Sequence, residues 1–153
     1  MRVAIAADHA GLPLKADIVA HVRKLGHEAI DLGAHELDPD DDYPDFAALV
    51  AEAVRDGRAD RGVLGCGSGV GASVAANKYP GVRAAVCHDT YSAAQGVEHD
   101  DMNVLCFGAR VIGPATATSL VTAFLGARFD SQPRFKRRLE KLLAIEQANT
   151  RQS

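Results

Sequence analysis

Residues 65 to 71 read Gly65-Cys66-Gly67-Ser68-Gly69-Val70-Gly71, between the apolar run Gly62 to Leu64 and the small-residue segment Ala72 to Asn77. This pattern predicts a strand, a glycine-rich turn and the start of a helix. Glycines let the backbone approach a ligand closely, and the first N–H groups of a helix have no partner inside it. Because the helix dipole adds partial positive charge there, the turn suits a phosphate, a carboxylate or a transient oxyanion.

Cys66 is the reactive candidate in this turn. A thiol near a helix N-terminus loses its proton more easily, so one turn can supply a base beside an anion hole. A dinucleotide fingerprint normally belongs to the first strand–helix turn and is followed by an acidic residue, whereas this turn is the third and lacks one. A Walker loop needs Lys followed by Ser or Thr after its last glycine, and this chain has Ala72-Ser73 there. A nucleophile elbow needs a glycine two positions before its serine, and Cys66 occupies that position before Ser68. A small buried cysteine at a strand end stays open as the alternative.

Length and composition limit the classes of protein to which the chain can belong. The chain has 153 residues, 47% of them hydrophobic, which predicts a single domain, 1–153, with an ordinary core. Its net charge of −3 argues against nucleic acid or an anionic membrane as the main partner. Three widely spaced cysteines form neither a disulfide framework nor a zinc pattern. With no leader-like segment and no run of membrane-spanning length, we expect a cytoplasmic protein.

Short apolar runs alternate with longer amphipathic segments, which is typical of βαβ units around a parallel sheet. We expect an α/β fold: a three-layer α/β/α Rossmann-like sandwich with a five-stranded parallel sheet and an appended C-terminal helix. The predicted strands are Val3 to Ala7, Glu28 to Leu32, Gly62 to Cys66, Arg83 to Cys87 and Val104 to Phe107. The predicted helices run from Leu14 to Leu25 and from Tyr43 to about Asp56, and others begin near Val70, Tyr91, Pro114 and Pro133.

The strand-to-helix turns of such a fold share the carboxyl edge of the sheet, where ligands bind. Polar residues end several strands there: Asp8-His9, Cys66 with its glycines, His88-Asp89 and Gly108-Ala109-Arg110. A shared site requires such a set, although each member has a plainer interpretation. Asp8 can cap the next helix and His9 can be an ordinary loop histidine. We interpret His88-Asp89 as helix capping, without a chemical role.

The acidic segment Asp38 to Asp45 lacks the glycine and the terminal glutamate of a calcium loop. We interpret it as a solvated loop. Tyr43 within it directly precedes a helix-starting proline near the carboxyl edge, so its ring can form the wall of a pocket.

Two further candidates lie elsewhere in the chain. His99, between a helix and the fifth strand, is either a general acid or a surface histidine. Its place at the amino edge is awkward for a site within one subunit, but it can reach a neighbour's site across a dimer interface. In the tail helix, about residues 133–149, Arg134 and Arg138 lie one turn apart and can converge on one dianion, or belong to a solvated face. Such an appended helix commonly packs on a partner subunit.

Together these segments resemble the family of B-type ribose-5-phosphate isomerases, which includes allose-6-phosphate and galactose-6-phosphate isomerases. The resemblance covers nearly the whole chain. It rests on Asp8-His9-Ala10-Gly11, Asp42-Tyr43-Pro44, Gly65 to Gly71, Ala75-Ala76-Asn77-Lys78, Tyr91-Ser92-Ala93, His99-Asp100, Asn103-Val104-Leu105, Phe107 to Val111 and Ala144 to Gln147.

The resemblance implies an aldose–ketose isomerase that works through an enediolate without metal or organic cofactor. Cys66 matches the catalytic base and His99 the residue that assists ring opening. Asp8 matches a residue that hydrogen-bonds to the sugar ring or its hydroxyls. The remaining matches are the anion hole at Gly67, Gly69, Val70 and Gly71, the sugar contacts Ser68 (in the catalytic loop) and Asn103, the pocket wall Tyr43, and the phosphate cluster His9, Arg110, Arg134 and Arg138. Family members are homodimers or dimers of dimers with active sites at the subunit interface.

The resemblance leaves the substrate open. Ribose 5-phosphate is the first expectation; allose 6-phosphate, galactose 6-phosphate, a four-carbon sugar phosphate and a non-catalytic sugar-phosphate-binding subunit are the alternatives. One branch of the family has a catalytic glutamate where this chain has Ala72, which favours Cys66 as the base. Many members have Gly-Gly-Arg-His before the tail helix, where this chain has Gln132-Pro133-Arg134-Phe135. Because Phe135 cannot bind an anion, the phosphate is left to the arginines and His9.

Overall fold

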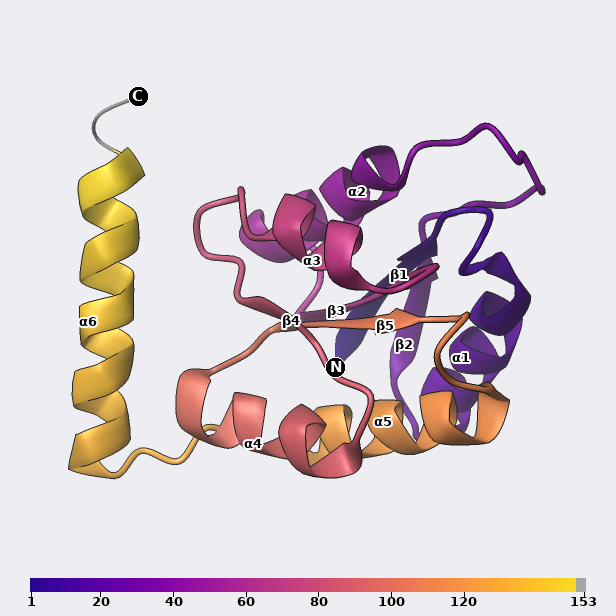
Figure 1. The fold of residues 1–153 in the computed structure, drawn as a ribbon. Helices are drawn as coiled ribbons and strands as arrows, with labels where there is room; N and C mark the ends of the chain where they lie inside the picture. The colour runs from indigo at the N-terminus through magenta and orange to yellow at the C-terminus, as the bar shows by residue number, and fades with distance from the viewer. Residues whose placement is uncertain (151–153) are drawn as a thin grey trace.

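The computed structural model describes residues 1–150 as a five-stranded parallel sheet with helices on both faces (Figure 1). The expected α/β fold with an appended C-terminal helix is confirmed, and each strand boundary lies within one residue of its predicted place. The elements are β1 (Arg2–Ala7), α1 (Leu12–Lys24), β2 (Glu28–Asp31), α2 (Tyr43–Arg55), β3 (Arg61–Cys66), α3 (Val70–Ala76), β4 (Ala84–Val86), α4 (Thr90–Asp100), β5 (Val104–Gly108), α5 (Pro114–Gly126) and α6 (Pro133–Thr150).

Both faces of the sheet are buried, because successive side chains of a strand point to opposite sides. Val3 and Ile5 of β1 pack in one core with residues of α1, α4 and α5. Ala4 and Ala6 of the same strand pack in a second core with residues of α2 and α3. Figure 1 shows the same division, with α2 and α3 over one face and α1, α4 and α5 over the opposite face.

The strand order creates a crevice at one place on the carboxyl edge. The order is β2-β1-β3-β5-β4, so the chain leaves β1 toward one side of the sheet and β3 toward the other. The two strands are neighbours, and Ala7 pairs with Gly65 at their carboxyl ends. Ligands of open α/β sheets bind where the connections diverge in this way. The turns after β1 and β3 therefore meet at the expected place for a site.

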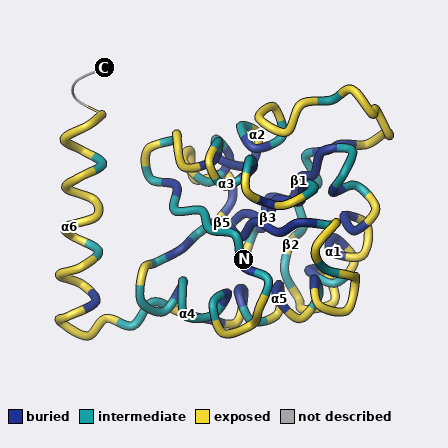
Figure 2. Tube along the Cα trace, viewed as in Figure 1, coloured by how far each residue is buried: buried dark blue, intermediate teal, exposed yellow. Residues whose placement is uncertain are grey.

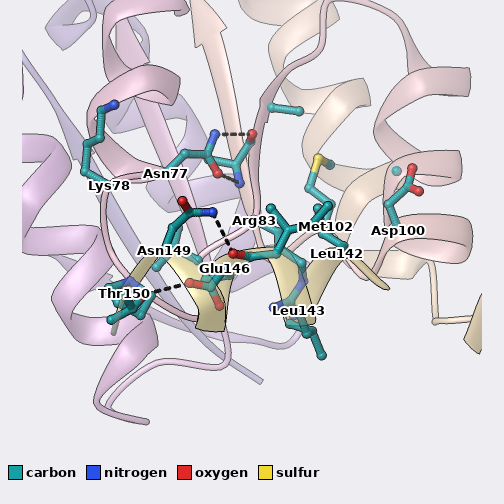
Figure 3. A pocket seen from close by; sticks show the side chains of 16 residues that line it. Asn77, Lys78, Arg83, Asp100, Met102, Leu142, Leu143, Glu146, Asn149 and Thr150 are labelled. Atoms are coloured by element: carbon teal, nitrogen blue, oxygen red, sulfur yellow. Dashed lines mark hydrogen bonds between the residues drawn. The ribbon is translucent and has the colours of Figure 1, made fainter. Parts of the chain in front are cut away.

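Helix α6 stands beside the main body rather than on the sheet (Figure 1). Phe135 is its buried residue, and Figure 2 shows most of the remaining helix exposed. Further along, the carboxylate of Glu146 accepts a hydrogen bond from the backbone N–H of Gly81 at 3.0 Å. A groove of about 640 Å³ lies between α6 and the β4–α4 side of the body (Figure 3). Within residues 1–150, no helix combines the length and apolar character that crossing a membrane requires.

Candidate active site

Cys66 ends β3 and lies under the glycine-rich turn. Its side chain is buried, and its Sγ accepts a hydrogen bond from the backbone N–H of Gly69 at 3.0 Å. Gly69 adopts a left-handed backbone with φ of 83°, which turns its N–H back toward the sulfur. A Cβ at this position would also lie 2.9 Å from the carbonyl carbon of Phe107. Only glycine fits there, and the donor that it provides stabilises negative charge on the sulfur.

The other two cysteines lack such a donor. Cys87 and Cys106 are both buried and free. Burial raises the pKa of each thiol above its ordinary value. Among the cysteines of residues 1–150, Cys66 alone receives a backbone N–H on its sulfur.

The turn after Cys66 leaves several backbone donors unused. Ser68 Oγ accepts the N–H of Val70 at 3.2 Å, which closes the turn locally. Within the described part of the chain, the N–H groups of Gly67, Ser68 and Gly71 have no protein acceptor. Unused donors next to a thiol are what an anion hole requires, because they can receive a developing oxyanion without rearrangement.

Residues after β5 hold this turn from behind. The N–H groups of Ala109 and Arg110 donate to the carbonyls of Cys66 and Gly67, at 2.8 and 3.1 Å. A Cβ at Gly108 would lie 2.7 Å from the carbonyl oxygen of Gly67, so the two turns touch through their backbones. The shape of the glycine turn therefore depends on β5 as well as on β3.

His88 and Asp89 take separate roles. Asp89 caps α4 by accepting the N–H of Ser92 at 2.7 Å, as the capping interpretation predicts. For His88 that interpretation is wrong, since its Nε2 accepts the N–H of Gly108 at 2.8 Å. His88 thus supports the strand end on which the glycine turn rests. Sequence reasoning missed this contact because the two residues are 20 positions apart and no motif joins them.

The turn after β1 packs against the end of β3. Asp8 is buried, and its Oδ1 accepts the N–H groups of Ala10 and Gly11, each at 3.0 Å. A Cβ at Gly11 would lie 2.4 Å from the carbonyl carbon of Gly65, so the turns are in direct contact. The interpretation of Asp8 as the cap of α1 is wrong, since the N-cap is Gly11 without a side-chain cap; the Asp8 carboxylate instead holds the turn that precedes the helix. Its role on the sugar stays a prediction.

Asp41 is a member of this edge that the sequence analysis missed. Its Oδ1 accepts the backbone N–H of His9 at 3.0 Å and lies 2.6 Å from the ring Nδ1. Only 9% of the Asp41 side chain is exposed, so interpreting the whole acidic segment as a solvated loop is wrong at this position. The hydrogen bond from Asp41 raises the pKa of His9 above its ordinary value, against the opposing effect of burial.

Arg110 and Tyr43 flank the glycine turn on its outer side. A Cβ at Gly67 would lie 3.6 Å from a guanidinium nitrogen of Arg110. A Cβ at Gly71 would lie 2.6 Å from Cζ of Tyr43, so the tyrosine ring lies directly against the turn. We call this group the Cys66 edge: Asp8, His9, Asp41, Tyr43, Arg110 and residues 66–71.

The remaining predicted residues gather at a second place, around Phe135. The His99 ring stacks on Phe135 with centroids 4.1 Å apart, and its Nδ1 lies 2.9 Å from Nε2 of Gln95. The guanidinium carbons of Arg134 and Arg138 lie 4.6 and 5.9 Å from the centre of the same phenyl ring. We call His99, Phe135, Arg134 and Arg138 the Phe135 junction, where α4 ends and α6 begins.

One chain does not bring this junction to Cys66. Residue 103, just before β5, has its carbonyl bonded to the N–H of Gly62 at the start of β3, four residues before Cys66. At the usual rise of a strand, Gly62 and Cys66 are about 13 Å apart. The side chain of Asn103 accepts the N–H of Arg83 at 2.7 Å and donates to the carbonyl of Gly81 at 2.9 Å. Asn103 thus supports the start of β4 and does not reach the glycine turn of its own chain.

The fold and the Cys66 edge define an α/β protein that can hold a small anionic ligand beside a thiol, with anion-binding donors on both sides of it. Residues 3–142 match the family described as Ribose/Galactose Isomerase, and the chain belongs to this family. Within it, the chain falls in the type B ribose-5-phosphate isomerase group and is a sugar-phosphate aldose–ketose isomerase.

Individual relatives cover almost the whole chain. The ribose-5-phosphate isomerase B of Escherichia coli K12 is 47% identical over 146 residues, or 95% of this chain and 97% of the relative. The D-erythrulose-4-phosphate isomerase of Pectobacterium atrosepticum is 40% identical over 130 residues, or 85% and 86% of the two chains. The solved structure of ribose-5-phosphate isomerase B from Mycoplasma genitalium with bound ribulose-5-phosphate has a TM-score of 0.91 at 41% identity, covering 95% and 96%.

Proposed function

We propose that the protein interconverts ribose 5-phosphate and ribulose 5-phosphate through an enediolate. The observation that carries the proposal is the buried Cys66 thiol, which accepts the N–H of Gly69 and is bordered by three backbone N–H groups without an acceptor among residues 1–150. A base and an anion hole in contact are what proton abstraction next to a carbonyl requires. The name of the Escherichia coli relative and the ligand of the Mycoplasma genitalium structure support the choice of substrate.

The Cys66 thiolate removes the proton from C2 of the open-chain aldose. The C2–H electron pair forms the C1–C2 double bond, and the aldehyde oxygen takes the negative charge. The free N–H groups of the glycine turn stabilise that oxygen, at about 3 to 4 kcal/mol per donor in comparable oxyanion holes. The hydroxyl proton on the C2 oxygen moves to the C1 oxygen, and the thiol returns the abstracted proton to C1 as the C2 oxygen becomes the ketone, so protons and electrons balance overall. Ser68 lies within reach of the sugar hydroxyls at the same turn.

The phosphate end of the substrate would lie at the cationic side of the Cys66 edge. Arg110 and the protonated His9 supply positive charge there, and Tyr43 walls the pocket beside Gly71. Arg134 and Arg138 would complete the cluster from a second copy of the chain.

We also propose that the working unit is a homodimer, or a dimer of dimers, with shared active sites. The support is the separation of the two groups: His99, Arg134 and Arg138 surround Phe135, away from Cys66 of the same chain. Helix α6 also exposes apolar side chains, among them Leu142 and Leu143 at the groove in Figure 3. A second copy that covers α6 would bury these side chains and bring its His99 to the ring oxygen of the substrate.

A four-carbon substrate is the second candidate, because one relative at 40% identity is named for D-erythrulose 4-phosphate. Proton NMR in heavy water distinguishes the candidates, with ribose 5-phosphate, D-erythrulose 4-phosphate and allose 6-phosphate offered separately. We expect conversion of ribose 5-phosphate with deuterium at the carbon that receives the proton. Reaction of only another phosphosugar would change the substrate and keep the mechanism. Reaction of none of them would favour a binding subunit.

A further inference from the structure

His9 makes two hydrogen bonds to Asp41, which is more than a histidine needs in order to bind a phosphate. One carboxylate oxygen of Asp41 accepts both the backbone N–H and the ring Nδ1 of His9, at 3.0 and 2.6 Å. The other oxygen, Oδ2, is buried and meets no hydrogen-bond partner within residues 1–150. Burying a carboxylate is costly unless a cation faces it. The arrangement is therefore most stable when the His9 ring is protonated.

Asp41 differs in this from the neighbouring acidic residues. Asp38, Asp40 and Asp42 are exposed, and the hydrogen bonds of His9 to this segment go to Asp41. The buried position of Asp41 thus serves one partner, which lies 32 residues earlier in the chain.

We propose that Asp41 is a positioning residue of the phosphate site, which holds the His9 ring in one orientation and in its cationic form. The proposal rests on the proposed function, because it takes the ligand of His9 to be the substrate phosphate. With Nδ1 bonded to Asp41, the ring offers Nε2 as its remaining donor, and 30% of the side chain is exposed. A cationic N–H forms a stronger, charge-assisted hydrogen bond with phosphate.

Three charged groups face His9, from three elements of the edge. Asp41 raises the pKa of His9 through its hydrogen bond, and Asp8 at the end of β1 raises it further. Arg110, after β5, lowers it, and burial also acts downward, but the pKa of His9 is raised on balance. A sugar phosphate becomes a dianion above about pH 6, where an ordinary histidine is losing its charge. A histidine paired with Asp41 keeps its charge into the range where the ligand is fully dianionic.

The same residues also have the spacing of a cation site, since ligand atoms of Asp8, His9 and Asp41 lie within 4.8 Å of one another. The 2.6 Å contact places a proton between Nδ1 of His9 and Oδ1 of Asp41, so neither atom offers a free lone pair to an ion in this arrangement. The geometry thus favours a proton-sharing pair over a metal site.

The variants Asp41→Asn and Asp41→Ala separate charge from orientation. Asp41→Asn keeps an acceptor oxygen for both His9 donors and removes the charge. The ratio of its KM for ribose 5-phosphate to that of the unchanged protein should be near one at pH 6. At pH 8 this ratio should rise to about ten, the size of one charge-assisted bond, while kcat stays unchanged. Asp41→Ala should raise KM at both pH values. Asp40→Asn, an exposed neighbour, is the matched control and should leave both profiles unchanged.

A double variant tests whether Asp41 acts through His9. In a His9→Asn background, adding Asp41→Asn should change KM by less than twofold at any pH. A full tenfold change in that background would overturn the proposal, since Asp41 would then act without His9. An equal rise of KM at pH 6 and pH 8 for Asp41→Asn would overturn it as well.

A binding measurement on the unchanged protein keeps the proposal separate from the isomerase activity. NMR titration of the histidine rings should show His9 gaining its proton at a higher pH than an ordinary histidine, and inorganic phosphate should perturb it. If His9 titrates at or below the ordinary value, the proposal fails even in an active isomerase. If the protein turns over no phosphosugar but His9 behaves as expected, the proposed function fails and the role of Asp41 stands.

Discussion

The Cys66 edge and the Phe135 junction contain the two halves of the predicted site, and they are built in different ways. At the edge, three turns touch through their backbones at Gly11, Gly69 and Gly108, and hydrogen bonds from the residues after β5 hold the carbonyls of Cys66 and Gly67. At the junction, His99 is held by side chains only, the stacked Phe135 ring and Gln95, and Arg134 and Arg138 are exposed. The edge is thus held by backbone contacts, whereas the junction is held by side chains whose outer side is exposed.

This difference matches the two tasks that we propose. Stabilising an enediolate needs donors that are already in place, because reorganisation would use up much of the benefit. Ring opening and phosphate binding tolerate side chains that are positioned only when a second subunit covers them. We therefore expect changes at Cys66 and its glycine turn to act mainly on kcat, and changes at the phosphate-binding residues and at the junction to act on KM or on assembly.

The largest effect should come from Cys66→Ala. Without the base, kcat should fall about 10²- to 10⁴-fold, while the phosphosugar still binds because the donors and cations remain. Deuterium exchange by NMR measures the first quantity and calorimetric titration the second. Cys87→Ala is the matched control, since this thiol is also buried but receives no backbone donor, and turnover should persist. Near-unchanged turnover in Cys66→Ala would mean that another group is the base.

Gly69→Ala should have the next largest effect. The new Cβ would lie 2.9 Å from the backbone of Phe107, at a φ that L residues rarely adopt, so the turn must shift and withdraw the N–H from Cys66. We expect kcat to fall about 10²-fold, comparable to the loss of one oxyanion donor. Gly26→Ala is the control, because Gly26 has φ of +87° with nothing within 4 Å of the added Cβ. It should lower the free energy of unfolding by about 1 kcal/mol and spare kcat.

The edge and the junction also show how much of the site could be predicted from the sequence alone. The strands were predictable because their apolar runs are short and β1, β3 and β5 are buried on both faces, and the glycine turn because its residue types have few other uses. Asp41 was not, since four neighbouring aspartates have the same local pattern and only the fold selects one of them for His9. Phe135 was recognised as unable to bind an anion, but its stacking on His99 joins two helices that no sequence period connects.

A mixing experiment tests whether the edge of one chain works with the junction of another. Cys66→Ala and His99→Ala should each be nearly inactive as homodimers. After unfolding and refolding of an equal mixture, about a quarter of the sites should be intact, because half of the dimers are mixed and each has one unaltered site. Turnover of about a quarter of the unaltered protein is therefore expected. Absence of any recovery in a mixture that has refolded as dimers would contradict the shared site.

The smallest effects should come from the exposed arginines of the junction. Arg134→Ala and Arg138→Ala should each raise KM about five- to tenfold with little change in kcat, as expected when a charge-assisted phosphate contact is lost. Lys136→Ala and Arg137→Ala are matched controls, since both residues are exposed cations on the same helix, whereas the cation–π contacts with the Phe135 ring come from Arg134 and Arg138. If all four variants have the same KM, the arginines belong to an ordinary solvated face. If only the first two raise it, the Phe135 ring sets which cations of α6 reach the phosphate, because it orients the guanidinium groups that lie over it.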